Sequence, residues 1–341
     1  MTTTAIVMLV TALFILLAML IIGLIGTRTN GNILLGVSLP NHALEDEAVL
    51  GIVKMYTRVY LLHALLCALL AVPIGFITRE DVAAFYFMFW FLLTLFLLLR
   101  LIERYFNRLY ELKVANQWWV GAEGSVAVDL AVSRVKHTFM ASAWCFLLPF
   151  GVCITLLVVD IAGGVAPFWP ILGLCMVALY FLVYCLISRI KTKTYSEDTS
   201  VNLQLNHVFK RMWSCCVIVL AMISCVYAAL PYVAAGADED VIWLVAALLF
   251  STASLVAVVL THDRIKAWRN RLLRPIQPIN KDEDQYWIGG IFYNNPNDAN
   301  IFVEKRIGIG FTMNIGILPG KLLLVGGIIF VIAAFVLPFW L

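Results

Sequence analysis

The chain has 341 residues, of which 62% are hydrophobic and only 13% are charged. A soluble domain carries about 25% charged residues, so this composition excludes an ordinary soluble protein and indicates a membrane protein. The net charge of +3 is small and spread over several loops, which argues against nucleic acid as a partner.

Eight apolar stretches are long enough to cross a hydrocarbon core, which takes about 20 residues per helix. They cover residues 5–25, 59–78, 82–99, 138–159, 168–188, 212–234, 241–261 and 322–340. The stretches are apolar on all faces instead of alternating with polar residues, so they predict helices and not membrane strands. The expected fold is an all-α polytopic membrane protein with eight transmembrane helices, arranged as helical hairpins, and a small cytoplasmic β-hairpin module.

The same pattern sets the expected domain organisation. Residues 1–261 form a seven-helix membrane region with cytoplasmic loops at 26–58, 100–137 and 189–211. Residues 262–321 form a basic helix followed by the β-module, and residues 322–341 form the eighth helix.

The basic residues predict an orientation. All but one of the 24 Lys and Arg residues lie in the loops that follow the first, third, fifth and seventh spans, and the exception is Arg79. Because loops rich in Lys and Arg stay in the cytoplasm, we expect a plasma-membrane protein with both termini outside the cell. The basic loops are expected to bind membrane lipids through anionic headgroups at the cytoplasmic face.

Proline recurs in the first helix of three successive hairpins, at Pro73, Pro149 and Pro231. Proline removes a helical hydrogen bond and kinks a helix, so three equivalent kinks predict a cavity open to the outer leaflet. The alternative is the ordinary frequency of proline in membrane helices. His63 lies one turn inside the second span. An ionisable group at this depth is a functional candidate, and a hydrogen-bonded interfacial histidine is the alternative.

Signatures of catalysis, cofactor binding and metal binding are missing from the sequence. The five histidines are scattered, and the eight cysteines fall within the predicted spans, where they serve as small packing residues. No Gly-Lys-Ser/Thr follows Gly308 and Gly310, so a phosphate loop is not indicated. We therefore expect no catalytic residue, no cofactor and no metal, and a protein that is not an enzyme.

The last cytoplasmic loop holds a compact set of aromatic and turn residues. The stretch 286–293 and the turn Asn294–Asp298 predict a β-hairpin, with a further strand near Ile301–Val303. A hairpin alone is only marginally stable. The short apolar segment Ile33–Leu39 of the first cytoplasmic loop is therefore expected to add a strand to it.

The polar and aromatic residues of this module form a candidate docking site for a peptide, or for a cytoplasmic or membrane partner protein. They are Trp287, Tyr293, Asp298, Lys305, Arg306 and Asn314. A purely structural module and a catalytic site are the alternatives. Lys305 and Arg306 are expected to pair with Glu304 or Asp298, or to touch lipid phosphate.

Two motifs in this region carry a family resemblance. The first is Asp-x-Tyr-Trp-x-x-Gly-x-x-Tyr-x-Asn-Pro-x-Asp over residues 284–298, and the second is Phe-Val-x-Lys-Arg-x-Gly-x-Gly-x-Thr-x-Asn over residues 302–314. Together they resemble the C-terminal domain of an uncharacterised, mainly Gram-positive bacterial family of integral-membrane proteins. That family is distantly similar to SdpI-like membrane proteins for immunity to, and signalling of, a peptide toxin. The resemblance implies a role in immunity or signalling, and it implies no catalytic residues.

These observations lead to three functional hypotheses. The first is a non-enzymatic membrane protein for sensing of, or immunity to, a peptide or envelope stress through the outer-leaflet cavity. The second is a transporter or flippase of a lipid-linked or amphiphilic substrate. The third, and the least supported, is an intramembrane enzyme that acts on lipid.

Overall fold

The structure is a computed structural model that describes residues 3–29, 31–120, 132, 135–233, 239–273 and 282–336. It is mostly helical, with short antiparallel strand pairs. Contacts divide the chain into two compact units. Unit 1 comprises Met1–Val126 and Asn280–Leu341, and unit 2 comprises Ala127–Ile279. The predicted domains divide the chain by hydropathy, into membrane and polar segments, whereas the two units divide it by contacts. The two divisions do not test each other, so the predicted domains stay a prediction.

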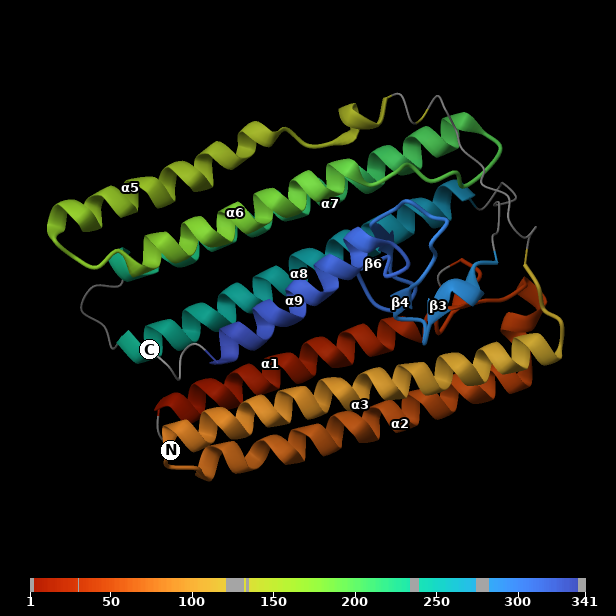
Figure 1. Cartoon of the computed structure of the whole chain (residues 1–341), viewed down its shortest axis with the longest axis horizontal. Helices are drawn as coiled ribbons and strands as arrows, with labels where there is room; N and C mark the ends of the chain where they lie inside the picture. Colours follow the sequence, from red (N-terminus) through yellow and green to blue (C-terminus); the bar gives the residue numbers. More distant parts are fainter. Residues whose placement is uncertain are drawn as a thin grey trace. The chain divides into compact units, whose positions relative to one another are not determined.

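Three helices that pack side by side form the framework of unit 1 (Figure 1). They are α1 (Thr3–Gly26), α2 (Glu47–Ala71) and α3 (Glu80–Ala115). Short 3-10 turns, η1 (Asn41–Glu45) and η2 (Val72–Phe76), precede and follow α2. The final helix of the unit is α9 (Leu318–Val336).

Polar side chains join the three helices at the depth of the predicted spans. The Tyr60 hydroxyl donates to the Met19 carbonyl oxygen at 2.5 Å, and Trp90 Nε1 donates to the Cys67 carbonyl oxygen at 2.8 Å. Hydrocarbon offers no water as a partner, so such donors need an acceptor within the protein. These bonds therefore fix the helices against one another as well as satisfying the donors.

The third helix is longer than a bilayer requires. Its 36 residues give a length of about 54 Å at 1.5 Å per residue, compared with a hydrocarbon core about 30 Å thick. The part after residue 99 therefore extends beyond the predicted third span. This extension provides the surface on which the β-elements of unit 1 pack.

The β-elements of unit 1 form three separate antiparallel pairs. The pairs are β1 (Ile33–Leu34) with β2 (Val37–Ser38), β3 (Trp287–Ile288) with β4 (Phe292–Tyr293), and β5 (Phe302–Glu304) with β6 (Phe311–Met313). A parallel bridge between Tyr293 and Asn314 joins the last two pairs. The C-terminal segment thus forms short antiparallel strands, as predicted, but the pairing differs. The turn Asn294–Asp298 connects β4 to β5, which belong to different pairs, instead of closing a hairpin.

The predicted addition of Ile33–Leu39 to that hairpin is wrong. The segment folds back on itself, with Ile33 opposite Ser38 and Leu34 opposite Val37. Its two-residue turn has positive φ at both positions, 46° at Leu35 and 84° at Gly36, as a type I′ hairpin turn requires. The strand thus pairs with residues three and five positions away in the sequence and does not join the distant hairpin.

The two loops that are predicted to be cytoplasmic nevertheless pack together, as expected. They share one buried apolar core with the extension of α3 and the nearby part of α2. Its buried members include Leu34, Val37, Leu39, Tyr56, Tyr105, Phe106, Leu109, Trp287, Tyr293 and Ile307. The N-terminal hairpin and the C-terminal module are therefore parts of one folded body with the helices.

A bundle of four helices makes up the helical part of unit 2 that the structure describes (Figure 1). They are α5 (Leu147–Gly163), α6 (Phe168–Arg189), α7 (Thr199–Val233) and α8 (Glu239–Leu273), with the short turns η3 (Lys136–Phe139) and η4 (Ala143–Phe146) before α5. Within its most apolar window, α7 is 50% buried and α8 only 11%. Since α7 also contacts each of the other three helices, it is the central helix of the unit.

Seven helices in the described parts of the chain are long and apolar enough to cross a membrane. They are α1, α2 with η2, α3, α5 with η4, α6, α7 and α8, and they overlap the first seven predicted spans. A helical membrane protein is thus supported. The apolar stretch of α9, Leu318–Gly327, is shorter than these seven. The eighth span therefore stays a prediction, as does the orientation of the termini.

The packing of the module on α3 depends on a glycine. Gly290 and Gly310 both have left-handed φ, 70° and 96°, but a Cβ at Gly290 would lie 2.7 Å from Phe106 Cδ2 whereas nothing lies within 4 Å of one at Gly310. We expect Gly290→Ala to cost about 2–5 kcal/mol of stability, from backbone strain plus overpacking. Gly310→Ala adds only the strain, about 1–2 kcal/mol. Thermal unfolding of the two purified variants in detergent tests the difference, and equal losses would contradict the close packing.

Candidate functional site

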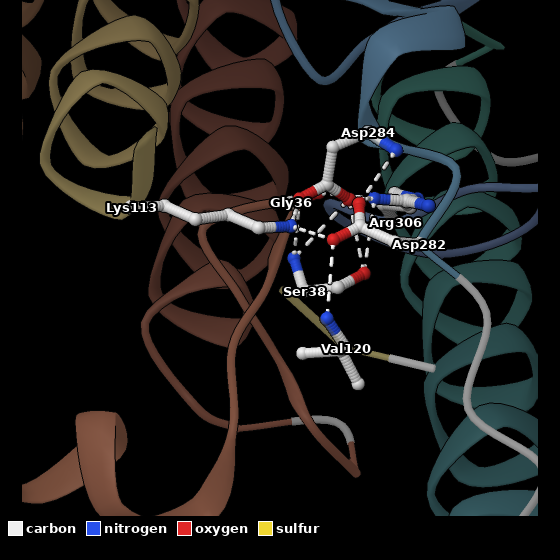
Figure 2. Close-up of polar contacts among 7 residues, drawn as sticks. All are labelled: Gly36, Ser38, Lys113, Val120, Asp282, Asp284 and Arg306. Carbon is white, nitrogen blue, oxygen red and sulfur yellow. Dashed lines mark hydrogen bonds and ion pairs between the residues drawn. The ribbon is translucent and has the colours of Figure 1, made fainter. Parts of the chain in front are cut away.

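Four buried charged side chains from three distant segments of unit 1 meet in one cluster (Figure 2). Lys113 comes from the last turn of α3, and Arg306 follows β5. Asp282 and Asp284 come from the segment that leads into η5 (Asp284–Tyr286). Ser38, the last residue of β2, completes the group, which we call the Asp284 cluster.

Asp284 lies at the centre of this cluster, and its side chain is 0% exposed. Its Oδ2 atom accepts from Lys113 Nζ at 2.6 Å and from the backbone N–H of Ser38 at 3.0 Å. Its Oδ1 atom accepts from the Ser38 hydroxyl at 3.0 Å and forms an ion pair with Arg306. Both carboxylate oxygens therefore have two partners each, and these hydrogen bonds and ion pairs offset the cost of burying the group.

Lys113 connects Asp284 to the second carboxylate. Its Nζ atom donates to Asp282 Oδ2 at 2.5 Å and lies 5.5 Å from the centroid of the Trp119 ring. The same Asp282 oxygen accepts from the backbone N–H of Val120 at 3.3 Å. The ammonium group of Lys113 thus holds the end of α3 to the C-terminal segment, and the Asp282 carboxylate holds the chain just after α3.

Arg306 connects Asp284 to the N-terminal hairpin. Its Nη1 atom donates to the Gly36 carbonyl oxygen at 3.0 Å and lies 3.3 Å from the Ser38 hydroxyl oxygen. Its guanidinium carbon lies 5.2 Å from the centroid of the Trp287 ring. The planar guanidinium group therefore binds a carboxylate and a carbonyl while stacking on an aromatic face, which a lysine could not do.

The chemistry of the Asp284 cluster is that of a structural joint. Two cations balance two carboxylates, and every charge has a partner inside the protein. Removing one partner from such a group leaves an uncompensated buried charge, which costs about 3–5 kcal/mol. No group of three or more His, Cys, Asp or Glu side chains that could hold a metal ion is found in the described ranges.

A second polar network organises the C-terminal module around Asn314, which is 0% exposed. Its Oδ1 atom accepts from the backbone N–H groups of Asn295 and Gly316, both at 3.0 Å. Its Nδ2 atom donates to the carbonyl oxygens of Asn295 at 2.8 Å and Asp298 at 2.7 Å. One amide side chain thus satisfies three backbone groups of the turn and one backbone N–H just after β6.

Tyr293 extends this network. Its hydroxyl oxygen accepts from Asn295 Nδ2 at 3.0 Å and lies 3.4 Å from Asp298 Oδ2. Burial, and then the charge of Glu283, raises the pKa of the Tyr293 phenol. The phenol therefore stays protonated at neutral pH and donates to the carboxylate.

The structure places the six residues of the predicted docking site in different environments. Trp287, Tyr293 and Asn314 are buried, Asp298 and Arg306 are partly buried, and Lys305 is exposed. For the buried residues this geometry favours the structural alternative, while docking on the remaining surface stays a prediction. The expectation that Arg306 pairs with Glu304 or Asp298 is wrong, because Asp284 is its partner.

Sequence reasoning missed Lys113, Asp282 and Ser38 as members of this site. Lys113 reads as one basic residue among many in a cytoplasmic loop. Its helical position four residues after Leu109 and seven after Phe106, both buried, was a usable signal, since residues at these spacings share one helix face. For Ser38 and Asp282 the sequence carries no comparable signal.

The residues of the predicted outer cavity fall in both units. In unit 1, Pro73 is exposed in η2, and His63 is half-buried on α2 with Nε2 3.5 Å from Cys67 Sγ. In unit 2, Pro149 is buried in α5, and Pro231 belongs to α7, where its side chain lies outside the described residues. A cavity shared by these positions stays a prediction.

A different cavity, of about 100 Å³, lies inside unit 2. Its walls come from the first turns of α6, the second half of α7 and one residue of α8, namely Trp169, Leu172, Gly173, Met176, Ser224, Tyr227, Ala228 and Phe250. The lining is apolar apart from Ser224, whose hydroxyl donates to the Leu220 carbonyl oxygen at 3.0 Å. If the predicted orientation holds, this half of unit 2 lies in the outer leaflet, and that placement stays a prediction.

A family of unknown function, DUF5808, matches residues 296–316. The match includes β5, β6 and Asn314, so it supports the C-terminal resemblance in part. Comparison with curated proteins and with solved structures found no match. The bacterial origin and the similarity to SdpI-like proteins therefore rest on the motifs alone.

The Asp284 cluster predicts a large effect of a nearly isosteric change. We expect Asp284→Asn to destabilise unit 1 by about 3–5 kcal/mol, since it leaves Lys113 and Arg306 short of one negative charge in a buried site. The control is Asp81→Asn, whose exposed ion pair with Arg79 should contribute nothing measurable. Thermal unfolding and limited trypsin digestion compare the variants, and similar behaviour of both would contradict the proposed importance of the cluster.

The Asn314 network predicts that a side chain of the same size without the amide donors cannot replace Asn314. Asn314→Asp keeps the acceptor but loses the Nδ2 donors to two buried carbonyl oxygens, each loss costing about 1–3 kcal/mol. Asn297→Asp, in the same turn but exposed, is the matched control and should unfold like the unmodified protein. If thermal unfolding ranks the two variants equally, Asn314 does not have the organising role assigned to it.

Proposed function

We propose that this chain is a non-enzymatic plasma-membrane protein that senses, or gives immunity to, a membrane-active peptide or a similar envelope stress. The proposal includes eight spans with both termini outside the cell. The observation that supports it most is the fixed attachment of the β-module to the helices of unit 1 through the Asp284 cluster. An enzyme needs an accessible reactive group, whereas the charges of this cluster are buried and mutually paired.

Rigid attachment is what a relay requires. The module shares its apolar core with α2 and α3, and the buried ion pairs add a second, directional joint. A shift or tilt of α3 would therefore carry the module surface with it, because a packed interface transmits displacement as a unit. In this proposal the exposed side chains of the module, such as Lys305, present the signal to a cytoplasmic or membrane partner.

The apolar cavity of unit 2 is the receiving site in this proposal. Its volume of about 100 Å³ is below the roughly 300–1,000 Å³ of pockets that hold a whole small molecule. It therefore suits a single apolar group, such as one aromatic or branched side chain of a peptide. A peptide lying in the outer leaflet would place that side chain from the lipid side, where Leu172 is 37% exposed.

A buried polar row on α7 favours the alternative of a transporter or flippase for a lipid-linked or amphiphilic substrate. Asn202, Asn206, Lys210 and Ser214 recur every fourth residue and are all buried. Each of them already has an internal bond, however. Asn202 and Asn206 hold the loop at 193–196, and Lys210 Nζ donates to the Ser188 carbonyl oxygen at 2.9 Å.

Filling the unit 2 cavity tests the proposal. We expect Leu172→Trp to weaken binding of a fluorescently labelled cationic amphipathic peptide to proteoliposomes by about tenfold, which corresponds to about 1.4 kcal/mol. Leu179→Trp is the matched control, because it lies two turns along the same helix, is 51% exposed and is not part of the cavity lining. It should bind the peptide as the unmodified protein does.

The same proteoliposomes separate the two functions. Transbilayer movement of a fluorescent phosphatidylcholine, read by dithionite quenching, should equal that of protein-free vesicles. Lipid movement that Leu172→Trp blocks would support the flippase alternative. Neither peptide binding nor lipid movement would contradict both.

A further inference from the structure

Exposed arginine residues lie on α2 and α3 near the ends of the predicted second and third spans. On α3, Arg100, Arg104 and Arg108 recur every fourth residue and are exposed, and on α2 Arg58 is exposed as well. Residues four apart on a helix lie on the same face. Three of these arginines therefore form one row along the extension of α3, and the fourth belongs to the neighbouring helix.

Arg58 and Arg104 lie at the same level of the two antiparallel helices. The level is set by Arg108, whose Nη1 atom lies 3.1 Å from Met55 Sδ. From that contact toward the predicted spans, Arg58 is three residues along α2 and Arg104 is four residues along α3. At 1.5 Å per residue these steps are about 4.5 Å and 6 Å. The two arginine side chains thus start from neighbouring helices within about one to two helical turns of the predicted span ends.

That depth is the headgroup layer of the membrane. Arg58 immediately precedes the predicted second span, and Arg104 lies five residues, or about 7.5 Å, past the predicted third span. The polar layer on each side of the hydrocarbon core is roughly 5–8 Å thick. A phosphate of a phospholipid headgroup therefore comes within reach of both side chains.

Both arginines are available for such a ligand. Arg100 pairs with Glu103 at 2.6 Å, and Arg108 contacts Met55. Within the part of the chain that the structure describes, neither Arg58 nor Arg104 has a hydrogen bond or an ion pair to another residue. They are thus cations without a counter-charge from the protein.

The surroundings of Arg104 leave room for a headgroup. A hollow of about 550 Å³ lies along α3, and the residues that line it in the described part of the chain all belong to this helix. Its lining consists of Arg100, Leu101, Glu103, Arg104, Asn107, Arg108 and Glu111. Arg100 and Glu103 neutralise each other, which leaves Arg104 and Arg108 against Glu111, so the hollow keeps a net positive charge.

The apolar surface for the acyl chains lies directly next to these arginines. Leu62 and Leu65 on α2 are 64% and 57% exposed, and Phe96 on α3 is 59% exposed. An anionic phospholipid would thus meet cations at its phosphate and apolar side chains along its tails.

We propose that Arg58 and Arg104 bind the phosphate of an anionic phospholipid between the ends of α2 and α3. A guanidinium group donates two parallel hydrogen bonds to phosphate oxygens, and two such groups at one level hold the headgroup from both sides. The inference rests on the membrane embedding that belongs to the proposed function. It adds a defined lipid site to the general affinity of basic loops for the cytoplasmic leaflet.

The test uses the purified full-length protein in detergent with added phosphatidylglycerol or phosphatidylcholine, and it counts retained lipids by native mass spectrometry. The unmodified protein should retain phosphatidylglycerol in preference to phosphatidylcholine. Arg58→Gln and Arg104→Gln should each reduce this preference about fivefold, and the double variant about thirtyfold. Arg58→Lys with Arg104→Lys should retain part of it, since the charge remains but the planar donor pair is lost.

Arg79→Gln is the matched control. Arg79 is an exposed arginine that precedes α3 at its opposite end and pairs with Asp81, so its removal should leave lipid retention unchanged. Equal retention by the double variant and the unmodified protein would overturn the proposal, and so would an equal loss in Arg79→Gln. Lipid retention in detergent does not involve the unit 2 cavity. Failure here together with normal peptide binding would thus refute the lipid site alone, and the reverse result would refute the sensing function alone.

Discussion

The folded state of unit 1 depends on one buried carboxylate. Asp284 takes its partners from α3, from the N-terminal hairpin and from the loop after β5, and Ser38 is 246 positions away from it in the sequence. Burying an ion costs several kcal/mol unless all of its partners are present. A partly assembled cluster is therefore less favourable than none, and the three segments are expected to order together. The apolar core drives the association, whereas the charges decide which arrangement is reached.

The extension of α3 beyond the predicted third span brings Lys113 to the Asp284 cluster. A helix that ended with the predicted third span would place Lys113 nowhere near the C-terminal segment. Because α3 continues to Ala115, its last turns carry both the apolar positions of the shared core and the ammonium group of the cluster. The helices of unit 1 and the β-module thus form one rigid body. Unit 2 is built differently: its central helix binds a loop through asparagine side chains and borders an apolar cavity.

The parts of this architecture that could be predicted from the sequence are those that local composition determines. Long apolar runs specify helices, because the signal lies within one element. The turn residues at 294–298 do make a turn, but it connects two strand pairs instead of closing a hairpin. The choice of partner is not local. Ile33–Leu39 has the composition of a strand, yet its pairing depends on a turn that puts Leu35 at a positive φ, which a leucine seldom adopts. Likewise Arg306 had acidic neighbours in the sequence, and its true partner became visible only in three dimensions.

The arginines show why charge counting alone could not separate structural residues from lipid-binding ones. Orientation rules treat Arg306, Arg58 and Arg104 alike, since all three fall in predicted cytoplasmic segments. Arg306 is partly buried, stacked on Trp287 and paired with Asp284, so its charge is used within the protein. Arg58 and Arg104 are exposed and lie where two antiparallel helices leave the predicted spans. A bias that is set during membrane insertion thus comprises two populations. One population is paired with carboxylates inside the folded chain, and the other is the one that we propose binds lipid phosphate.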